Sequence, residues 1–103
     1  MNLPIEQQTV LVTGAGRGLG SEIAKSFHRE GAKVIINYRN SYKSAKHLSD
    51  SLGENAILVK GDIREKDQVS KMHEELVSQN IRVDTIIHNA INDFIFNGDQ
   101  RKK

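Results

Sequence analysis

Residues 13–20 read Thr-Gly-Ala-Gly-Arg-Gly-Leu-Gly, and this glycine loop decides the fold because of what stands on either side of it. Residues 9–13 (TVLVT) form a short β-branched run, which is typical of a strand buried on both faces. After the glycines, Leu19, Ile23 and Phe27 recur every four residues and predict one apolar stripe of a helix. A glycine loop between a strand and a helix lets an anion approach the backbone and the N–H groups of the helix N-terminus.

The alternation of strand and helix continues to about residue 90. Further strands are predicted at residues 33–38 (KVIINY), 56–59 (AILV) and 83–88 (VDTIIH). Further helices are predicted at about 42–52 and, ending near Asn80, on the stripe of Val69, Met72 and Leu76. Gly31 and Gly53 are expected to end the first two helices. This order predicts an α/β fold in one domain over residues 1–103, with a parallel sheet built through right-handed crossovers.

The composition is that of a soluble globular protein without disulfide or thiolate chemistry. The chain has 37% hydrophobic and 27% charged residues, no cysteine, and four histidines without paired metal-ligand spacing. A net charge of +2 is too small to indicate nucleic-acid binding, and the basic run 101–103 is interpreted as solvated charge. No apolar run approaches the roughly 20 residues that span a bilayer, and no secretory signal is recognisable. We therefore expect a cytoplasmic protein that binds neither membrane nor nucleic acid.

The glycine loop resembles the cofactor-binding motif of short-chain dehydrogenases/reductases. It fits neither the strict G-x-G-x-x-G pattern nor a P-loop, but it fits T-G-x-x-x-G-x-G without a mismatch. The subgroup it most resembles is the 3-oxoacyl-acyl-carrier-protein reductases. The resemblance implies a Rossmann-like sheet, truncated after its fourth strand, that binds a nicotinamide dinucleotide at the loop. The loop residues expected to contact the cofactor are Gly14, Gly16, Arg17, Gly18, Leu19 and Gly20.

Two further pairs of residues match this family. Asp62 and Ile63, just past the third strand, match a pair that lies against the adenine ring in family members. Asp62 could also cap the third helix, with residue 65 as its capping-box partner, and the two roles are compatible. Asn89 and Ala90 match the centre of the family's N-N-A-G element, which borders the cofactor. The first asparagine and the glycine of that element are replaced here.

The end of the second strand favours NADP(H) over NAD(H). An acidic residue there would accept hydrogen bonds from the ribose 2′-hydroxyl, but residues 37–41 (NYRNS) contain none. Arg39 can pair with a 2′-phosphate, and Arg17 adds a cation where NADP-preferring relatives often have one. Ser41 either adds a hydroxyl to the phosphate site or caps the second helix. Tyr38, Arg39 and Ser41 are thus the candidate cofactor contacts at this strand end.

The resemblance implies a catalytic serine and a Tyr-x-x-x-Lys element beyond the fourth strand. Tyr42 and Lys46 have that spacing, but they lie on the second predicted helix, far from where the nicotinamide would bind. We therefore assign no catalytic and no metal-binding residue, and we expect the chain to be inactive alone. The alternative is a stand-alone nucleotide-binding or interaction module without catalysis. A sheet that stops at its fourth strand also leaves an edge that invites self-association.

Overall fold

The computed structural model describes residues 3–89. In this part of the chain four strands and three α-helices alternate, as the sequence predicts. The strands are β1 (Thr9–Val12), β2 (Lys33–Tyr38), β3 (Ala56–Lys60) and β4 (Thr85–Ile87). The helices are α1 (Gly18–Arg29), α2 (Tyr42–Leu52) and α3 (Lys66–Ser78), and a short 3-10 turn, Ile5–Gln7, precedes β1. Ala90 and the basic run 101–103 lie outside the described residues.

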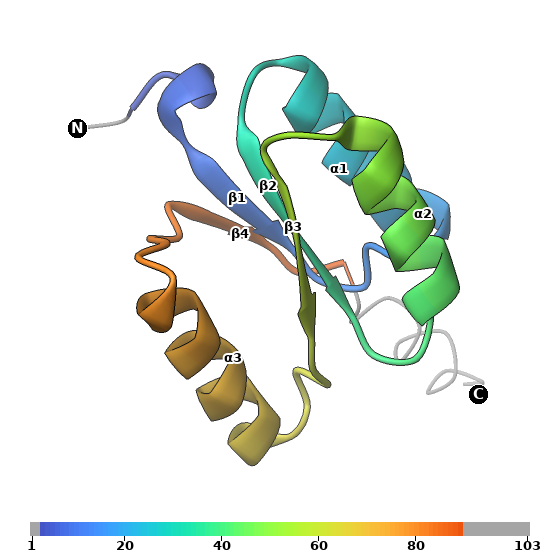
Figure 1. The fold of residues 1–103 in the computed structure, drawn as a ribbon, viewed down its shortest axis with the longest axis vertical. Coiled ribbons are helices and arrows are strands. Elements are labelled where there is room, and N and C mark those ends of the chain that lie inside the picture. The colour runs from blue at the N-terminus through green and yellow to red at the C-terminus, as the bar shows by residue number, and fades with distance from the viewer. Residues whose placement is uncertain (1–2, 90–103) are drawn as a thin grey trace, which may run out of the picture.

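The strands form one parallel sheet in the order β3-β2-β1-β4. Helices α1 and α2 cover one face of the sheet, and α3 lies on the other (Figure 1). The strand order changes direction at β1, because β2 and β3 lie on one side of it and β4 on the other. In open α/β sheets, ligands bind at the carboxyl ends of the strands where the order reverses. The fold therefore places the loop after β1 at the expected ligand site.

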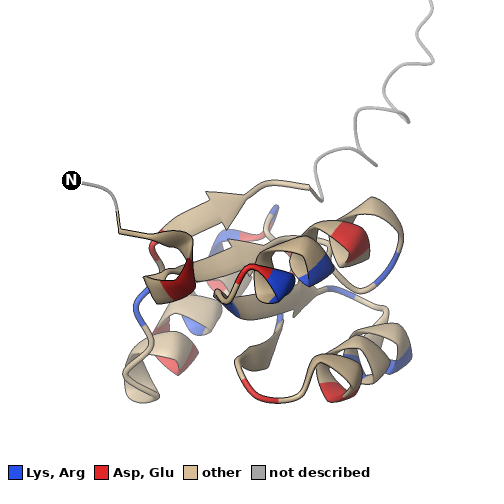
Figure 2. Cartoon of the chain, turned by 90° about the horizontal axis from the view of Figure 1, so that it is seen from above, with Lys and Arg blue, Asp and Glu red and all other residues tan. Residues whose placement is uncertain are grey.

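Both faces of the sheet are buried, as the continuous apolar runs predict. The strand side chains buried under α1 and α2 are Val10, Val12, Val34 and Ile36. Those on the α3 face are Leu11, Ile35 and Val59, which pack with Met72 and Leu76 of α3. Charged residues lie mostly on the helices and the connecting turns (Figure 2). Within residues 3–89, no helix is long and apolar enough to cross a membrane.

Two predicted apolar stripes are wrong at their first residue. Leu19 is 61% exposed, and Val69 is 41% exposed. Each belongs to the first turn of its helix. Gly20 and Ala24 form the buried side of α1 instead. Leu19 therefore lies outside the core, at the N-terminal end of α1 next to the glycine loop.

Candidate cofactor-binding site

The glycine loop connects β1 to α1 through two residues with left-handed backbone angles. Gly14 has φ 63° and Gly18 has φ 62°, values that glycine adopts without steric cost. Arg17, the N-cap of α1, is extended and exposed. The first N–H groups of a helix have no intrahelical acceptor and carry the positive end of its dipole. The loop thus places the N-terminal N–H groups of α1 at the carboxyl edge of the sheet, an arrangement that suits an anion.

The end of β4 holds one side of this loop. The backbone N–H and the hydroxyl of Thr13 both donate to the carbonyl oxygen of Ile87, over 3.0 and 3.3 Å. Asn89 Nδ2 donates to the carbonyl oxygen of Gly14 over 3.1 Å. A Cβ on Gly20 would overlap that carbonyl oxygen and lie 2.6 Å from Asn89 Nδ2. The structure therefore brings three predicted site residues, Gly14, Gly20 and Asn89, into one contact.

The end of β2 holds the other side of the loop, through a residue that the sequence analysis did not select. Asn37 is only 2% exposed, and its Oδ1 accepts a hydrogen bond from Gly14 N–H over 3.3 Å. Its Nδ2 donates to the carbonyl oxygens of Gly61 over 3.0 Å and Val59 over 3.4 Å. Its own carbonyl oxygen accepts from Ala15 N–H over 2.9 Å. An amide inside an apolar run was the available signal in the sequence.

Past β3, Asp62 lies between two arginines. Arg64 donates to Asp62 Oδ1 from its backbone N–H and from Nε, both over 3.0 Å, and to Oδ2 from Nη2 over 2.9 Å. Arg39 Nη1 lies 3.7 Å from the same Oδ2. The hydrogen bonds from Arg64 hold the pKa of Asp62 well below the ordinary range of a carboxyl, and the charge of Arg39 adds to the effect. Asp62 therefore stays ionised. Its close partner, Arg64, was not among the residues predicted from the sequence.

Neither Asp62 nor Ser41 makes a side-chain cap bond. Asp62 does not cap α3, because that helix begins at Lys66 after Glu65, which makes no side-chain cap bond. The backbone N–H of Asp62 instead donates to Gln68 Oε1 over 2.8 Å. Ser41 occupies the N-cap position of α2, but its hydroxyl makes no cap bond. The glycine loop packs against Ser41, since a Cβ on residue 16 would lie 3.0 Å from Ser41 Cβ.

The remaining candidates differ in how they lie. Tyr38 is 9% exposed and packs in the core under α1 and α2, with its ring centroid 5.8 Å from that of Tyr42. Burial raises the pKa of Tyr38, and neighbouring Tyr42 adds to the shift. The ring of Tyr38 thus packs at the end of β2, on the face of the sheet that α1 and α2 cover. Ile63 is half-buried beside Asp62. Lys46 Nζ pairs with Asp50 Oδ1 over 3.0 Å on the exposed side of α2.

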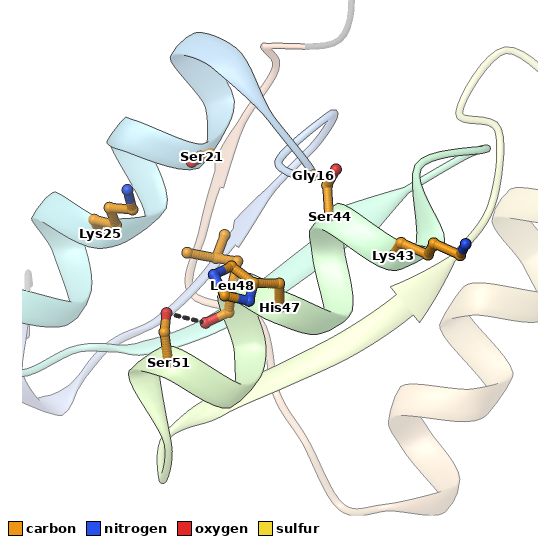
Figure 3. A pocket seen from close by; sticks show the side chains of 8 residues that line it. All are labelled: Gly16, Ser21, Lys25, Lys43, Ser44, His47, Leu48 and Ser51. Carbon is orange, nitrogen blue, oxygen red and sulfur yellow. Dashed lines mark hydrogen bonds between the residues drawn. The ribbon is translucent and has the colours of Figure 1, made fainter.

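A hollow of about 580 Å³ lies between α1 and α2 (Figure 3). Its lining residues are Gly16, Ser21, Lys25, Lys43, Ser44, His47, Leu48 and Ser51. It reaches the glycine loop only at Gly16. Lys25 Nζ is paired with Glu22 over 3.2 Å, and the side chain of Lys43 points away from the other lining residues (Figure 3). Among the described residues that the sequence predicts to contact the cofactor, only Gly16 lines this hollow.

Residues 8–96 match the short chain dehydrogenase family, and the chain belongs to it. It is 36% identical over 92 residues to versicolorin reductase stcU of Emericella nidulans, covering 86% of this chain and 35% of the relative. It is 40% identical over 76 residues to trihydroxynaphthalene reductase PfmaI of Pestalotiopsis fici, covering 71% of this chain and 27% of the relative.

A similar solved structure is the 3-ketoacyl-(acyl-carrier-protein) reductase from Brucella melitensis complexed with NADH. It superposes with a TM-score of 0.73 at 34% identity, covering 80% of this chain and 33% of that one. The chain thus spans about a third of the length of the proteins it matches. The family resemblance and the Rossmann-like parallel sheet predicted from the sequence are both confirmed.

Proposed function

We propose that this chain is the cofactor-binding part of an NADP(H)-dependent oxidoreductase that acts on a carbonyl substrate. The observation that carries the proposal is the glycine loop at the point where the strand order reverses, held between Asn37 and Asn89. Asp62 and Arg39 stand at the ends of the neighbouring strands, at the same edge of the sheet. The loop would hold the pyrophosphate, and Asp62 with Ile63 would lie against the adenine ring.

The arrangement of charges supports NADP(H) as the cofactor. Arg64 holds Asp62 through two side-chain hydrogen bonds of 2.9 and 3.0 Å, whereas Arg39 stands 3.7 Å from that carboxylate. The side chain of Arg39 is 51% exposed. Because Arg64 makes the close hydrogen bonds to Asp62 and the contact of Arg39 is long, we expect the exposed guanidinium of Arg39 to accept a 2′-phosphate as a second partner. Arg17, exposed at the start of α1, is the second cation of the proposed phosphate site.

The substrate is proposed only as a carbonyl compound. The relatives are named for versicolorin and for trihydroxynaphthalene, and the similar structure is named for a 3-ketoacyl group. The resemblance to 3-oxoacyl-acyl-carrier-protein reductases makes fatty acid biosynthesis the first process to test. These 103 residues contain two tyrosines. The family resemblance places the catalytic tyrosine beyond the fourth strand, whereas Tyr38 ends β2 and Tyr42 begins α2. We therefore propose that this chain transfers no hydride on its own.

Isothermal titration calorimetry of the full chain with NADPH and NADH tests the proposal. We expect both to bind and NADPH to bind more tightly, since only NADPH offers a phosphate to Arg39. Circular dichroism of the same sample establishes that the chain is folded. A folded chain that binds neither cofactor would contradict the proposal and would favour an interaction module without a nucleotide.

A further inference from the structure

Asn37 is a buried amide at the end of β2 that contacts both sides of the cofactor site. We propose that Asn37 is a positioning residue, which ties the glycine loop to the turn after β3 so that the two form one preorganised site. The glycine loop is the pyrophosphate side of that site, and the turn, residues 61–62, is its adenine side. The proposal rests on the proposed function for the nature of the ligand.

The sheet register places Asn37 where both neighbours leave the sheet. Strand β2 lies between β1 and β3. Ile36 is the last residue of β2 to pair with β1, opposite Val12, and Asn37 pairs with Val59 near the end of β3. At this level the Asn37 side chain reaches Gly14 N–H on one side and the Gly61 carbonyl on the other. One side chain therefore spans the exits of both neighbouring strands.

The chemistry of this position favours an amide over any other side chain of its size. The contact with Gly14 needs an acceptor, and the contact with the Gly61 carbonyl needs a donor. A carboxylate would set a second oxygen against that carbonyl, and a leucine would leave both backbone groups without this partner. Buried polar groups that lose their hydrogen bonds are costly, so either change should move the loop or the turn.

The turn after β3 is packed closely against the side chain of Met72. A Cβ on Gly61 would overlap Met72 Sδ and lie 2.7 Å from Met72 Cγ. Asn37 Nδ2 also lies 3.7 Å from Met72 Sδ. The next residue in the chain is Asp62, whose carboxylate pairs with Arg39 and Arg64. Because Gly61 and Asp62 are consecutive, we expect a shift of the Gly61 carbonyl to displace the proposed adenine side of the site.

Two variants and one control test the role of Asn37 in the full chain. Asn37→Leu removes both hydrogen-bonding groups, and Asn37→Asp keeps the acceptor but loses the donor. Ile35→Val is the control, because Ile35 is fully buried on the same face of the same strand and packs only in the apolar core. For each chain, amide hydrogen exchange of Gly14, thermal unfolding and the dissociation constant for NADPH are measured.

We expect Asn37→Leu to speed exchange of the Gly14 amide by about 10-fold, the effect of one lost hydrogen bond. It should weaken NADPH binding by about 10-fold, since a freed loop holds its binding geometry only part of the time. Asn37→Asp should leave Gly14 exchange near the wild-type rate and still weaken NADPH binding, because only the turn is displaced. Asn37→Asp carries the test if Asn37→Leu does not fold.

Ile35→Val should lower the unfolding temperature and leave both Gly14 exchange and NADPH affinity unchanged. Losses of affinity in the Asn37 variants no larger than in Ile35→Val would overturn the proposal, as would unchanged Gly14 exchange in Asn37→Leu. If the wild-type chain binds neither NADPH nor NADH, the proposed function fails, and the exchange rates alone decide whether Asn37 holds the loop.

Discussion

Asn89 donates a hydrogen bond from its side-chain amide to the carbonyl oxygen of Gly14, over 3.1 Å and across 75 residues of sequence. The residue that follows β4 thus fastens the loop that leaves β1. Helix α1 comes close to this contact at Gly20, where a Cβ would overlap the Gly14 oxygen.

Gly20→Ala should lower both stability and cofactor affinity. The added methyl group displaces Gly14 or Asn89, and overpacking of this kind costs about 1 to 3 kcal/mol. Chemical denaturation measures the stability, and an NADPH titration measures the affinity. Gly53→Ala is the control, because Gly53 ends α2 with φ 77° and nothing lies within 4 Å of an added Cβ. That variant should lose stability through backbone strain and keep its NADPH affinity; a similar loss of affinity in both variants would contradict the account.

Arg64→Ala should destabilise the chain in a pH-dependent way. The pKa of Asp62 is lowered in the folded state, chiefly by the hydrogen bonds from Arg64. The stability that the interaction of Asp62 with Arg64 contributes is therefore complete above the ordinary carboxyl pKa of about 4. That stability is lost as the pH falls toward the lowered pKa of Asp62. The gap in melting temperature between wild type and Arg64→Ala should be constant from pH 8 to about pH 5 and close in more acidic buffer.

The exposed pair of Lys46 and Asp50 provides the control for that experiment. Lys46→Ala should change the melting temperature little at any pH, since exposed ion pairs of this kind contribute little. A gap for Arg64→Ala that persisted undiminished in acid would mean that Arg64 stabilises the turn by packing rather than through the Asp62 carboxylate.

Tyr42 and Lys46 should have no catalytic role. We expect the chain, supplied with NADPH and an acetoacetyl-type carbonyl substrate, to show no oxidation of NADPH above background. A positioned general acid typically contributes about 10² to 10⁴ in rate, and we propose that none stands at this site. Absorbance at the NADPH band follows the reaction. Turnover that disappeared in Tyr42→Phe would contradict this prediction and make α2 the site of chemistry.

The outer edge of β4 should promote self-association. Among residues 3–89, no strand pairs with β4 on the side away from β1, and Ile86 at its centre is 49% exposed. Unpaired strand edges are templates for association with another chain. Sedimentation velocity should show species larger than a monomer for wild type, and fewer for Ile86→Lys. Val77→Lys, on the exposed side of α3, is the control and should sediment like wild type. A monodisperse wild-type monomer would refute this prediction.

The sequence predicts the elements of this fold well because their signals are local. The bounds of β2 and α2 agree with the predicted 33–38 and 42–52, since glycine or a polar turn stands at each end. Strand β4 is shorter than the predicted 83–88, because only residues 85–87 pair with β1. The continuous apolar runs predict a sheet covered on both faces, and the two buried clusters confirm it.

The contacts of the candidate site are less predictable. Asn37 sits in an apolar run and gives no local sign of its partners, which come from β1 and β3 only when the sheet forms. Arg64 reaches Asp62 because the turn between them folds back, a conformation that spacing does not specify. The alternative role of Asp62 in a capping box is not realised for the same reason, since the turn directs its carboxylate to Arg64 rather than to α3.

The affinity of the chain for NADPH and NADH, compared between wild type and Arg39→Ala, tests the central claim most directly. A charge-assisted hydrogen bond to the 2′-phosphate is worth roughly 1.5 to 3 kcal/mol, so NADPH should bind about 10-fold to 100-fold more weakly to the variant. NADH has no 2′-phosphate, and its affinity should hardly change. Arg39→Asp should tilt the preference toward NADH, because a carboxylate repels the phosphate and accepts from a free ribose hydroxyl. Equal losses for both cofactors, or no loss for either, would contradict the assignment of Arg39 to the cofactor phosphate.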